Sequence, residues 1–543
     1  MGPFSSVVIL PRGTTNNENI FVFLVFFAAK HFQIRRACVA FGSKIVVGAV
    51  QRYNAWMVFY GSSARRLGTD VLGCVLLLLT VIFPVAPVRA ASAAAPANVP
   101  LADEGVLLYE GIVVLPTYPV ERYQTAVIDP QYNWPYLQFD YERFLREAPA
   151  PQPRAYRTII LENEYLRMTI LPELGGRLWR VVHKPTGNDL FYHNSVVMPS
   201  PWGPADMRGW LAIGGLEWNL PQVEHGYAWG TPWDVASLKN NGQTATVTLS
   251  TPRDGRTLGA TVAIGLQAGE AAFTVDQTIA NLSEDPVRFS YWNSAALAPG
   301  KANRPSAETH FVAPTAAVVV HSSDDTQLPG AGHTIPWPVV KGRDLSRLGN
   351  WNQYLGFFEQ PAAHGPFVGV YDRTQDAGAV RVFPADVARG SKIFGLGWQH
   401  ALDPSIYTTD HSAYVELHGG LAPTFADQVS LPAGAAVKWQ ETWYPVAGIG
   451  DLVVANANGA LNWARVGDGL RVGIYPTRPL RATLVVSAGD DEVARWPVQA
   501  RPDAPFDQVV PLASLPASAL TLRLEDSDGA LLLGTHTPAL TQK

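Results

Sequence analysis

An all-β fold is predicted by three features of this 543-residue sequence. Short apolar runs recur from Val106 onward between Gly, Pro, Asn and Asp turns, as in "QTATVTLSTP" and "PFVGVYDR". Several runs alternate with period two, so that Thr246 and Thr248 oppose Val247 and Leu249. The composition is rich in Gly, Pro and aromatic residues, which is typical of turn-rich β structure.

Helices are expected to be few. "YERFLREA" at Tyr141–Ala148 is one short candidate, whereas "LGNWNQYLGFFE" is expected to be a loop followed by a strand. Many short strands at this spacing are typical of β-sandwiches, so we expect stacked sheets rather than a helical layer.

The first hundred residues contain a candidate export signal. Arg65 and Arg66 precede an uncharged apolar run of 18 residues, Val71–Val88, and small residues at Val88 and Ala90 suit cleavage after Ala90. A membrane anchor is the alternative, because 18 uncharged residues approach the length needed to span a bilayer. Two prolines and the cleavage-like end of the run favour a signal peptide at residues 57–90.

The position of this signal raises a question about the start of the protein. Because secretory signals are N-terminal, we expect Met57 to be the true start and residues 1–56 to be a mis-assigned extension. Residues 91–105 are expected to be a linker. The expected location is secreted, periplasmic or in the cell envelope, with no membrane span left after cleavage.

A domain boundary is expected near "WYPVAGIGDLVVAN". Residues 106–446 are predicted to form the larger β domain. Residues 447–543 contain alternating strands joined by "GDD" and "DSDG" turns, which favours a small immunoglobulin-like sandwich. This second domain has no cluster of acids with histidine, so we expect it to support or dock rather than to carry chemistry.

Composition excludes several kinds of function. The net charge of -5 and the absence of a basic run give no support for a nucleic-acid partner. The two cysteines, Cys38 and Cys74, exclude a disulfide framework and a multi-cysteine metal site. There is no HExxH or His-x-His motif, so neither a metal nor another cofactor is predicted.

The stretch from Gly214 to Val235, "GGLEWNLPQVEHGYAWGTPWDV", concentrates acids, a histidine and tryptophans without a clear period. It belongs to a region, Trp202–Trp233, that holds five of the chain's 16 tryptophans within 32 residues. Indole rings can stack on the apolar faces of sugar rings while polar groups orient the ligand. A carbohydrate site is one interpretation, and a tryptophan-rich corner of the core is the other.

Several motifs occur in the order found in an uncharacterised bacterial family with a galactose-mutarotase-like domain. They are "LENEYLRMTILPELGGRLW", "GGLEWNLP" followed by His225, "YWNSAALAP", "YVELHGGLAPTF" and "ETWYPVAGIG". The region from Tyr156 to Val446 resembles this family, whose members are often fused to tetratricopeptide repeats; the aldose and hexose-phosphate 1-epimerases are more distant relatives. The resemblance implies a β-supersandwich with a concave, sugar-binding surface.

The resemblance also implies roles for individual residues. In the epimerases a glutamate acts as base on the anomeric hydroxyl while a histidine protonates the ring oxygen. Glu416 in "YVELHGG" matches the place of that glutamate, and His225 matches an early histidine that contacts the sugar. The segment "RFSYWNSAA", which corresponds to the principal acid histidine, contains no histidine.

Three classes of function remain open. One is a sugar-acting enzyme, either an aldose 1-epimerase-like isomerase or a glycoside hydrolase that uses Glu217 and Glu416 as paired acids. The second is a non-catalytic glycan-binding module of the cell envelope, favoured by the missing histidine. The third is a structural or assembly protein of the cell envelope, which would expose aromatic patches without convergent acids. The expected catalytic residues are Glu416, Glu217 and His225, while Glu224 is expected to be a solvated loop acid. The expected sugar-binding residues are Trp218, Trp229, Trp233, Asn219, Trp292, Asn293, Arg177 and His418.

Overall fold

The computed structural model describes residues 105–203, 207–360, 365–467, 469–512 and 519–536. Four short strands are also assigned nearer the N-terminus, and they pair as β1 with β2 and β3 with β4. Their bounds are Val7–Ile9, Phe23–Val25, Ala37–Phe41 and Lys44–Gly48. The predicted signal peptide at residues 57–90 lies outside the described residues.

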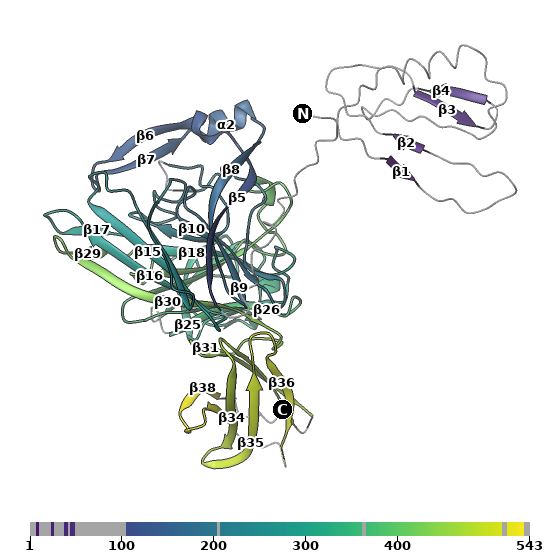
Figure 1. Ribbon diagram of the computed structural model, residues 1–543, viewed down its shortest axis with the longest axis vertical. Coiled ribbons are helices and arrows are strands. Elements are labelled where there is room, and N and C mark those ends of the chain that lie inside the picture. Colours follow the sequence, from purple (N-terminus) through teal and green to yellow (C-terminus); the bar gives the residue numbers. More distant parts are fainter. Residues whose placement is uncertain are drawn as a thin grey trace. The chain divides into compact units, whose positions relative to one another are not determined.

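The larger part of the molecule contains a sheet of twelve strands (Figure 1). Its path runs β21-β20-β24-β27-β28-β18-β11-β10-β9-β8-β5, and β12 pairs with both β10 and β18. In that order the bounds are Thr334–Pro336, Ala317–Ser323, Leu355–Gln360, Gly390–Gly395, Val415–Gly420, Trp292–Gly300, Asn188–Phe191, Arg177–His183, Leu166–Leu171, Gln152–Glu162 and Leu107–Thr117, with β12 at Gly215–Asn219.

A second sheet of eight antiparallel strands packs against the first. Its order is β13-β14-β15-β16-β30-β26-β25-β19. The bounds are Asp234–Asn240, Thr244–Ser250, Leu258–Gln267, Phe273–Asn281, Ala436–Ala447, Ala377–Val382, Phe367–Asp372 and Thr309–Val312. Phe191 of the first sheet contacts Phe273 and Trp443 of the second, so apolar side chains of both sheets share one core.

Smaller elements decorate this sandwich. Three short strand pairs are β6 with β7, β17 with β29 and β22 with β23. Their bounds are Gln124–Asp129, Trp134–Phe139, Val287–Phe289, Val429–Leu431, Val339–Val340 and Arg343–Asp344. One α-helix, α2 (Tyr141–Glu147), is described, and the 3-10 turns are η1 (Val120–Tyr123), η2 (Leu348–Asn350) and η3 (Pro404–Ile406).

The C-terminal strands form two four-stranded sheets, ordered β31-β32-β33-β36 and β35-β34-β37-β38 (Figure 1). Their bounds in chain order are Val454–Asn456, Gly459–Val466, Gly469–Pro476, Leu480–Ala488, Asp491–Ala500, Phe506–Pro511, Thr521–Glu525 and Leu531–His536. They enclose a separate apolar cluster that includes Leu470, Val486 and Leu522.

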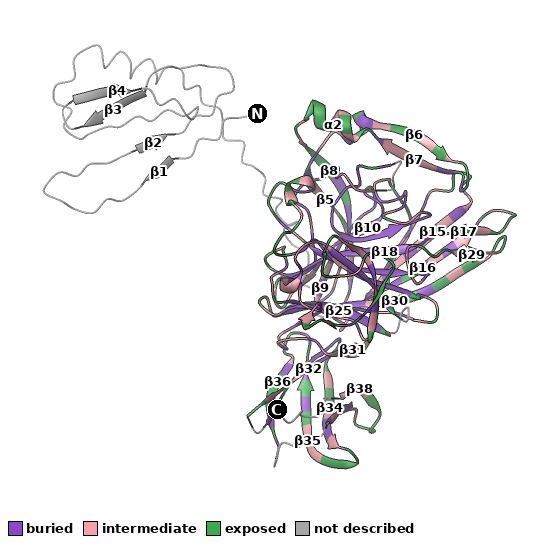
Figure 2. Ribbon diagram, turned by 180° about the vertical axis from the view of Figure 1, so that it is seen from behind, coloured by how far each residue is buried: buried purple, intermediate pink, exposed green. Residues whose placement is uncertain are grey.

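Residues of the central strands of the large sheet are more buried than residues of the C-terminal strands (Figure 2). All nine residues of β18, near the middle of the large sheet, are buried, whereas β35 of the C-terminal sheets carries mostly exposed or half-buried residues. A strand buried on both faces can direct polar side chains only into enclosed sites. Buried polar and ionisable side chains are therefore expected on β18 and the strands next to it.

The structure confirms the predicted all-β class and three local predictions. The candidate helix at Tyr141–Ala148 is present as α2, and Asp140 caps it by accepting from the Arg143 amide. "LGNWNQYLGFFE" is a 3-10 turn, a short loop and then β24. The alternation predicted around Thr246 is confirmed in β14, where Val247 and Leu249 are buried.

Among the described residues, no helix is long and apolar enough to cross a membrane.

Candidate functional site

A cavity of about 320 Å³ opens on the face of the large sheet that points away from the second sheet. The central strands supply its ionisable groups, because β27 and β28 pair with Lys392 opposite His418 and Phe394 opposite Glu416. In a strand, residues two apart share a face, so these four side chains point the same way. The lining residues are Trp202, Trp210, Asn219, Glu224, His225, His321, Ser322, Tyr354, Lys392, Phe394, Leu396, Leu402, Tyr414, Glu416, His418 and Phe425.

Glu416 and His418 form a hydrogen-bonded pair on β28. The two residues are 6% and 3% exposed, and His418 Nε2 lies 2.8 Å from Glu416 Oε2. Burial opposes ionisation of Glu416, but His418, Lys392 and His225 outweigh it and hold the pKa of this carboxyl below its ordinary value. Burial and Lys392 lower the pKa of His418 to about 4. At neutral pH the pair is therefore an ionised carboxylate beside a neutral imidazole.

Glu217 lies on β12 and is held from behind by Arg177. Arg177 donates from Nη2 to Glu217 Oε2 at 3.1 Å, and its other bonds go to the carbonyls of Leu174, Gly214 and Trp229. Both side chains are almost completely buried, at 1% and 3% exposure. Glu217 does not line the cavity, because these partners and His225 surround its carboxylate.

Two glycine positions place β12 and the loop after it. Gly215 has φ +76, and a side chain there would begin 2.4 Å from the carbonyl oxygen of Leu178. Gly226 has φ +57, and a Cβ there would lie 2.3 Å from the amide nitrogen of Leu220. Only glycine allows this close approach of backbones, which brings the loop back over Glu217.

His225 is carried on a left-handed backbone and oriented by Glu217. Glu224 and His225 have φ of 54° and 73°, a conformation that non-glycine residues rarely adopt. The Nδ1 of His225 donates to Glu217 Oε1 at 2.7 Å, and Trp210 stacks on the ring at 3.9 Å between centroids. Since Nδ1 is engaged, Nε2 is the ring nitrogen left for the cavity that His225 lines.

Glu416 and His225 therefore meet at one cavity from different elements. Glu416 comes from a central strand, and His225 comes from the loop after β12. The charge of His225 is one of the influences that lower the pKa of Glu416, so the two groups interact. A carboxylate and an oriented imidazole that face one cavity are suited to act as general base and general acid.

A third acid–histidine contact joins His321 and Glu224, which both line the cavity. His321 Nε2 is 3.4 Å from Glu224 Oε1. This contact, with help from Lys392, lowers the pKa of Glu224 to about 2 against the opposing effect of burial. Glu224 was expected to be only a solvated loop acid; half of its side chain is exposed, but it also lines the cavity.

The four tryptophans predicted to bind the sugar lie outside the cavity. Trp218 points away from Glu217 because neighbours in a strand face opposite sides, and its Nε1 donates to the Gly176 carbonyl. Trp229 and Trp233 are 2% and 3% exposed in the core, and Trp292 packs against Phe358 and Phe425. None of these four rings lines the cavity; Trp202 and Trp210 do.

The remaining expected binding residues divide in the same way. Asn219 and His418 line the cavity, as expected of sugar-binding residues. Asn293 faces the core instead, where its amide donates to Glu441 and Gln277. Arg177 lies behind Glu217. Its guanidinium donates hydrogen bonds to three backbone carbonyls and to the Glu217 carboxylate, so it is not available to a ligand.

Sequence reasoning missed His321, Lys392, Tyr354 and Tyr414. His321, Lys392 and Tyr354 are single residues outside the quoted family motifs, whereas Tyr414 begins the "YVELHGG" motif and was passed over beside Glu416. A faint signal exists for Lys392, since "SKIFG" places one lysine inside an apolar alternating strand, where an unpaired charge is unusual.

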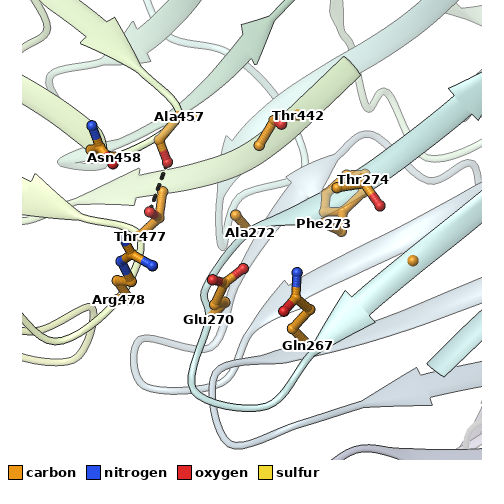
Figure 3. A pocket seen from close by; sticks show the side chains of 11 residues that line it. Gln267, Glu270, Ala272, Phe273, Thr274, Thr442, Ala457, Asn458, Thr477 and Arg478 are labelled. Atoms are coloured by element: carbon orange, nitrogen blue, oxygen red, sulfur yellow. Dashed lines mark hydrogen bonds between the residues drawn. The ribbon is translucent and has the colours of Figure 1, made fainter. Parts of the chain in front are cut away.

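Neither metal binding nor a second reactive site is visible in the described ranges. These residues contain no group of three or more His, Cys, Asp or Glu suited to a metal ion. A further cavity of about 240 Å³ is lined by residues of β15, β16 and the turns between the C-terminal strands. Figure 3 shows its lining side chains. Glu270, Gln267 and Arg478 line it together with threonines, but no histidine does. It lacks an acid–base pair, so the first cavity is the candidate active site.

The fold and this cavity define a class: a β-sandwich domain with glutamate–histidine pairs gathered on one face. Residues 129–446 match the family described as "Domain of unknown function (DUF5107)", and residues 454–534 match "YphG-like protein, second domain". Because the first match spans more than half of the chain, the protein belongs to the DUF5107 family.

Solved structures are similar to this chain. A TPR-domain containing protein from Parabacteroides distasonis shares 21% identity with a TM-score of 0.52; the match covers 63% of this chain and 55% of that one. Galactose mutarotase-like proteins from Clostridium acetobutylicum and Lactobacillus casei share 10% and 12% identity, with TM-scores of 0.39 and 0.37. These matches cover 54% and 53% of this chain and 96% and 99% of theirs.

This chain spans about half the length of the Parabacteroides protein, and at 21% identity that likeness shows a shared fold. The predicted membership in an uncharacterised family is confirmed.

Proposed function

We propose that this protein binds a reducing sugar in the cavity and interconverts its anomers, as an aldose 1-epimerase does. The observation that carries the proposal is the meeting of an ionised, buried Glu416 with a histidine whose tautomer is set by Glu217. The galactose mutarotase-like names of similar structures agree with a sugar ligand.

The mechanism needs one proton removed and one delivered at the two ends of the C1–O5 edge. Glu416 takes the proton of the anomeric hydroxyl. In its doubly protonated form, with Nδ1–H held by Glu217, His225 passes its Nε2 proton to the ring oxygen as the C1–O5 bond breaks. The open-chain aldehyde rotates about C1–C2, and the reverse transfers close the other anomer. Trp202 and Phe394, on the cavity wall, offer apolar faces for the sugar ring.

Hydrolysis by Glu217 and Glu416 as paired acids has less support. Glycosidases need both carboxyl groups at the scissile bond, one on each side. Glu217 is 3% exposed and lies behind His225, so it acts as a positioning residue for the imidazole rather than as a group that touches substrate.

The test is anomer exchange followed by polarimetry and by NMR, with D-glucose, D-galactose and D-xylose as substrates. Glu416→Gln and His225→Gln should each reduce the rate by about 10²- to 10⁴-fold, because each removes one proton-transfer group. Glu142→Gln, an exposed acid on α2, is the matched control and should retain full activity. Sugar binding without any acceleration by the wild type would instead support a glycan-binding module.

Secretion is part of the proposal. Its support is the order of basic residues, apolar run and small-residue exit before Ala90. The mass of the mature N-terminus tests it: a chain that begins at residue 91 supports export, and a chain that retains residues 57–90 supports an anchor.

A further inference from the structure

One cation in the cavity has no partner. Lys392 is 4% exposed and lines the cavity from β27. Within the described part of the chain, no carboxylate lies within 4 Å of its Nζ and no hydrogen bond engages it. Its contacts are two aromatic rings, with Nζ 4.5 Å from the centroid of Phe425 and 5.1 Å from that of Phe394.

These surroundings disfavour a charged ammonium. An ammonium group has three N–H donors, and none of them meets an acceptor here. Burial lowers the pKa of Lys392, while Glu416 and Glu224 oppose the change from beyond ion-pair distance. A lowered pKa increases the fraction of Lys392 that is neutral at a given pH, and the neutral amine carries the lone pair that attacks carbonyl carbon.

The amine is also next to the group that would open the sugar. Lys392 is directly opposite His418 and diagonal to Glu416 in the β27–β28 ladder. Diagonal neighbours on one sheet face lie within reach of long side chains. An aldehyde released at Glu416 therefore forms within reach of this amine.

We propose that Lys392 Nζ forms an imine with C1 of the open-chain sugar. The inference rests on the proposed function, since ring opening supplies the aldehyde. Nitrogen attacks C1 to give a carbinolamine, and the C1–O bond then breaks. Both amine hydrogens leave with that oxygen as water, relayed by Glu416 and His418, so no oxidant or reductant is required. The product is a lysine-bound sugar imine.

An alternative role for Lys392 is to bind an anionic substituent of the sugar, but the charges of the cavity disfavour it. The same cavity is lined by Glu224 and Glu416, and the pKa of each lies below its ordinary value. A third negative group beside Lys392 would meet both of these carboxylates, whereas an aldehyde is neutral and would not.

The test is reductive trapping of the full-length protein with sodium cyanoborohydride and either D-galactose or the tetrose D-erythrose, which cannot close a pyranose ring. Intact mass should increase by the sugar less one oxygen atom, and peptide mapping should place the addition on Lys392. Trapping there should be faster than at exposed lysines, because burial lowers the pKa of Lys392, whereas an ordinary lysine is neutral in only about one molecule in 2,500 at pH 7.

Three controls make the result specific. Methyl galactoside, which cannot open, should give no adduct. Lys392→Met should abolish the fast adduct, and Lys239→Met, an exposed lysine on β13, should leave it unchanged. Mapping of the wild type gives the answer even if Lys392→Met fails to fold.

The outcomes separate the two proposals. Anomer exchange without a fast adduct at Lys392 overturns the imine and retains the epimerase. A fast adduct with D-erythrose but no anomer exchange supports the imine and overturns the epimerase. Adducts spread evenly over exposed lysines overturn the imine.

Discussion

The two faces of the β27–β28 strand pair hold charged groups in opposite ways. On the core face, Arg381 packs over Gly419 and donates through Nε and Nη2 to Glu441. Glu441 also accepts from the indoles of Trp439 and Trp443 and from Asn293. On the cavity face, the Lys392 amine contacts two aromatic rings and has no hydrogen bond or ion pair with any of the described residues.

The difference distinguishes structural charge from reactive charge. A buried charge that is surrounded by donors or acceptors of its own protein is stabilised in the folded state and has little left to offer a ligand. A buried ionisable group without such partners is costly to charge, so its position is better explained by a ligand than by folding. Glu441 belongs to the first kind, and Lys392 belongs to the second.

The largest effect is expected from breaking the core pair. Arg381→Met leaves Glu441 buried without its cation and should lower the free energy of unfolding by about 3–5 kcal/mol. Urea denaturation followed by tryptophan fluorescence measures this change. Arg501→Met removes an exposed pair with Asp503 and should cost less than about 1 kcal/mol. Equal losses of unfolding free energy in Arg381→Met and Arg501→Met would show that the buried pair is no more important to stability than the exposed one.

Glu359 sharpens the comparison, since it is buried on β24 without a hydrogen-bond partner for either oxygen. Burial raises its pKa from 4.5 to about 7, so between these pH values the folded state holds a proton that the unfolded state releases. Stability should therefore fall as pH rises from 4.5 to 7, by about 3 kcal/mol, since one pKa unit corresponds to about 1.4 kcal/mol.

Glu359→Gln cannot ionise and should remove this pH dependence. Unfolding free energies at pH 5 and pH 8 measure it, with the exposed Glu308→Gln as control. An unchanged slope in Glu359→Gln would show that another group titrates.

Trp210 belongs to both the cavity wall and the buried network. Its Nε1 donates to Glu217 Oε2 at 3.1 Å while its ring stacks on His225. Trp210→Phe keeps a ring but removes a hydrogen bond to a charged group, which should lower the unfolding free energy by about 2 kcal/mol. Thermal unfolding measures the loss, and a variant as stable as wild type would show that this bond is not formed.

The smallest effect on stability is expected at Lys392. Replacing an unpartnered buried amine with an apolar side chain of similar length should change the unfolding free energy by less than about 1 kcal/mol, or increase it. Lys392→Met and Arg381→Met thus form a matched pair from the two faces. A loss of about 3 kcal/mol or more in Lys392→Met would assign that lysine a structural role.

Much of the fold could be predicted from sequence, because alternation and turn residues are local signals. Glu416 and His418 come from one motif and share a face of β28, because residues two apart in a strand point the same way. Trp218 was predicted to bind sugar from the density of tryptophans, but it adjoins Glu217 in β12 and faces the other side. The role of Glu217 depends on Arg177, forty positions away. Lys392 and His321 are single residues that only the sheet order brings together.

The backbone is left-handed at three successive residues from Glu224 to Gly226, which limits the substitutions that this loop accepts. A side chain at position 226 would collide with the backbone of Leu220, and most residues resist the φ of 73° at His225. Substitutions in this loop should therefore destabilise the fold whichever substrate is used. We expect changes of substrate preference to be tolerated better at the strand positions around Lys392 and His321 than in the loop.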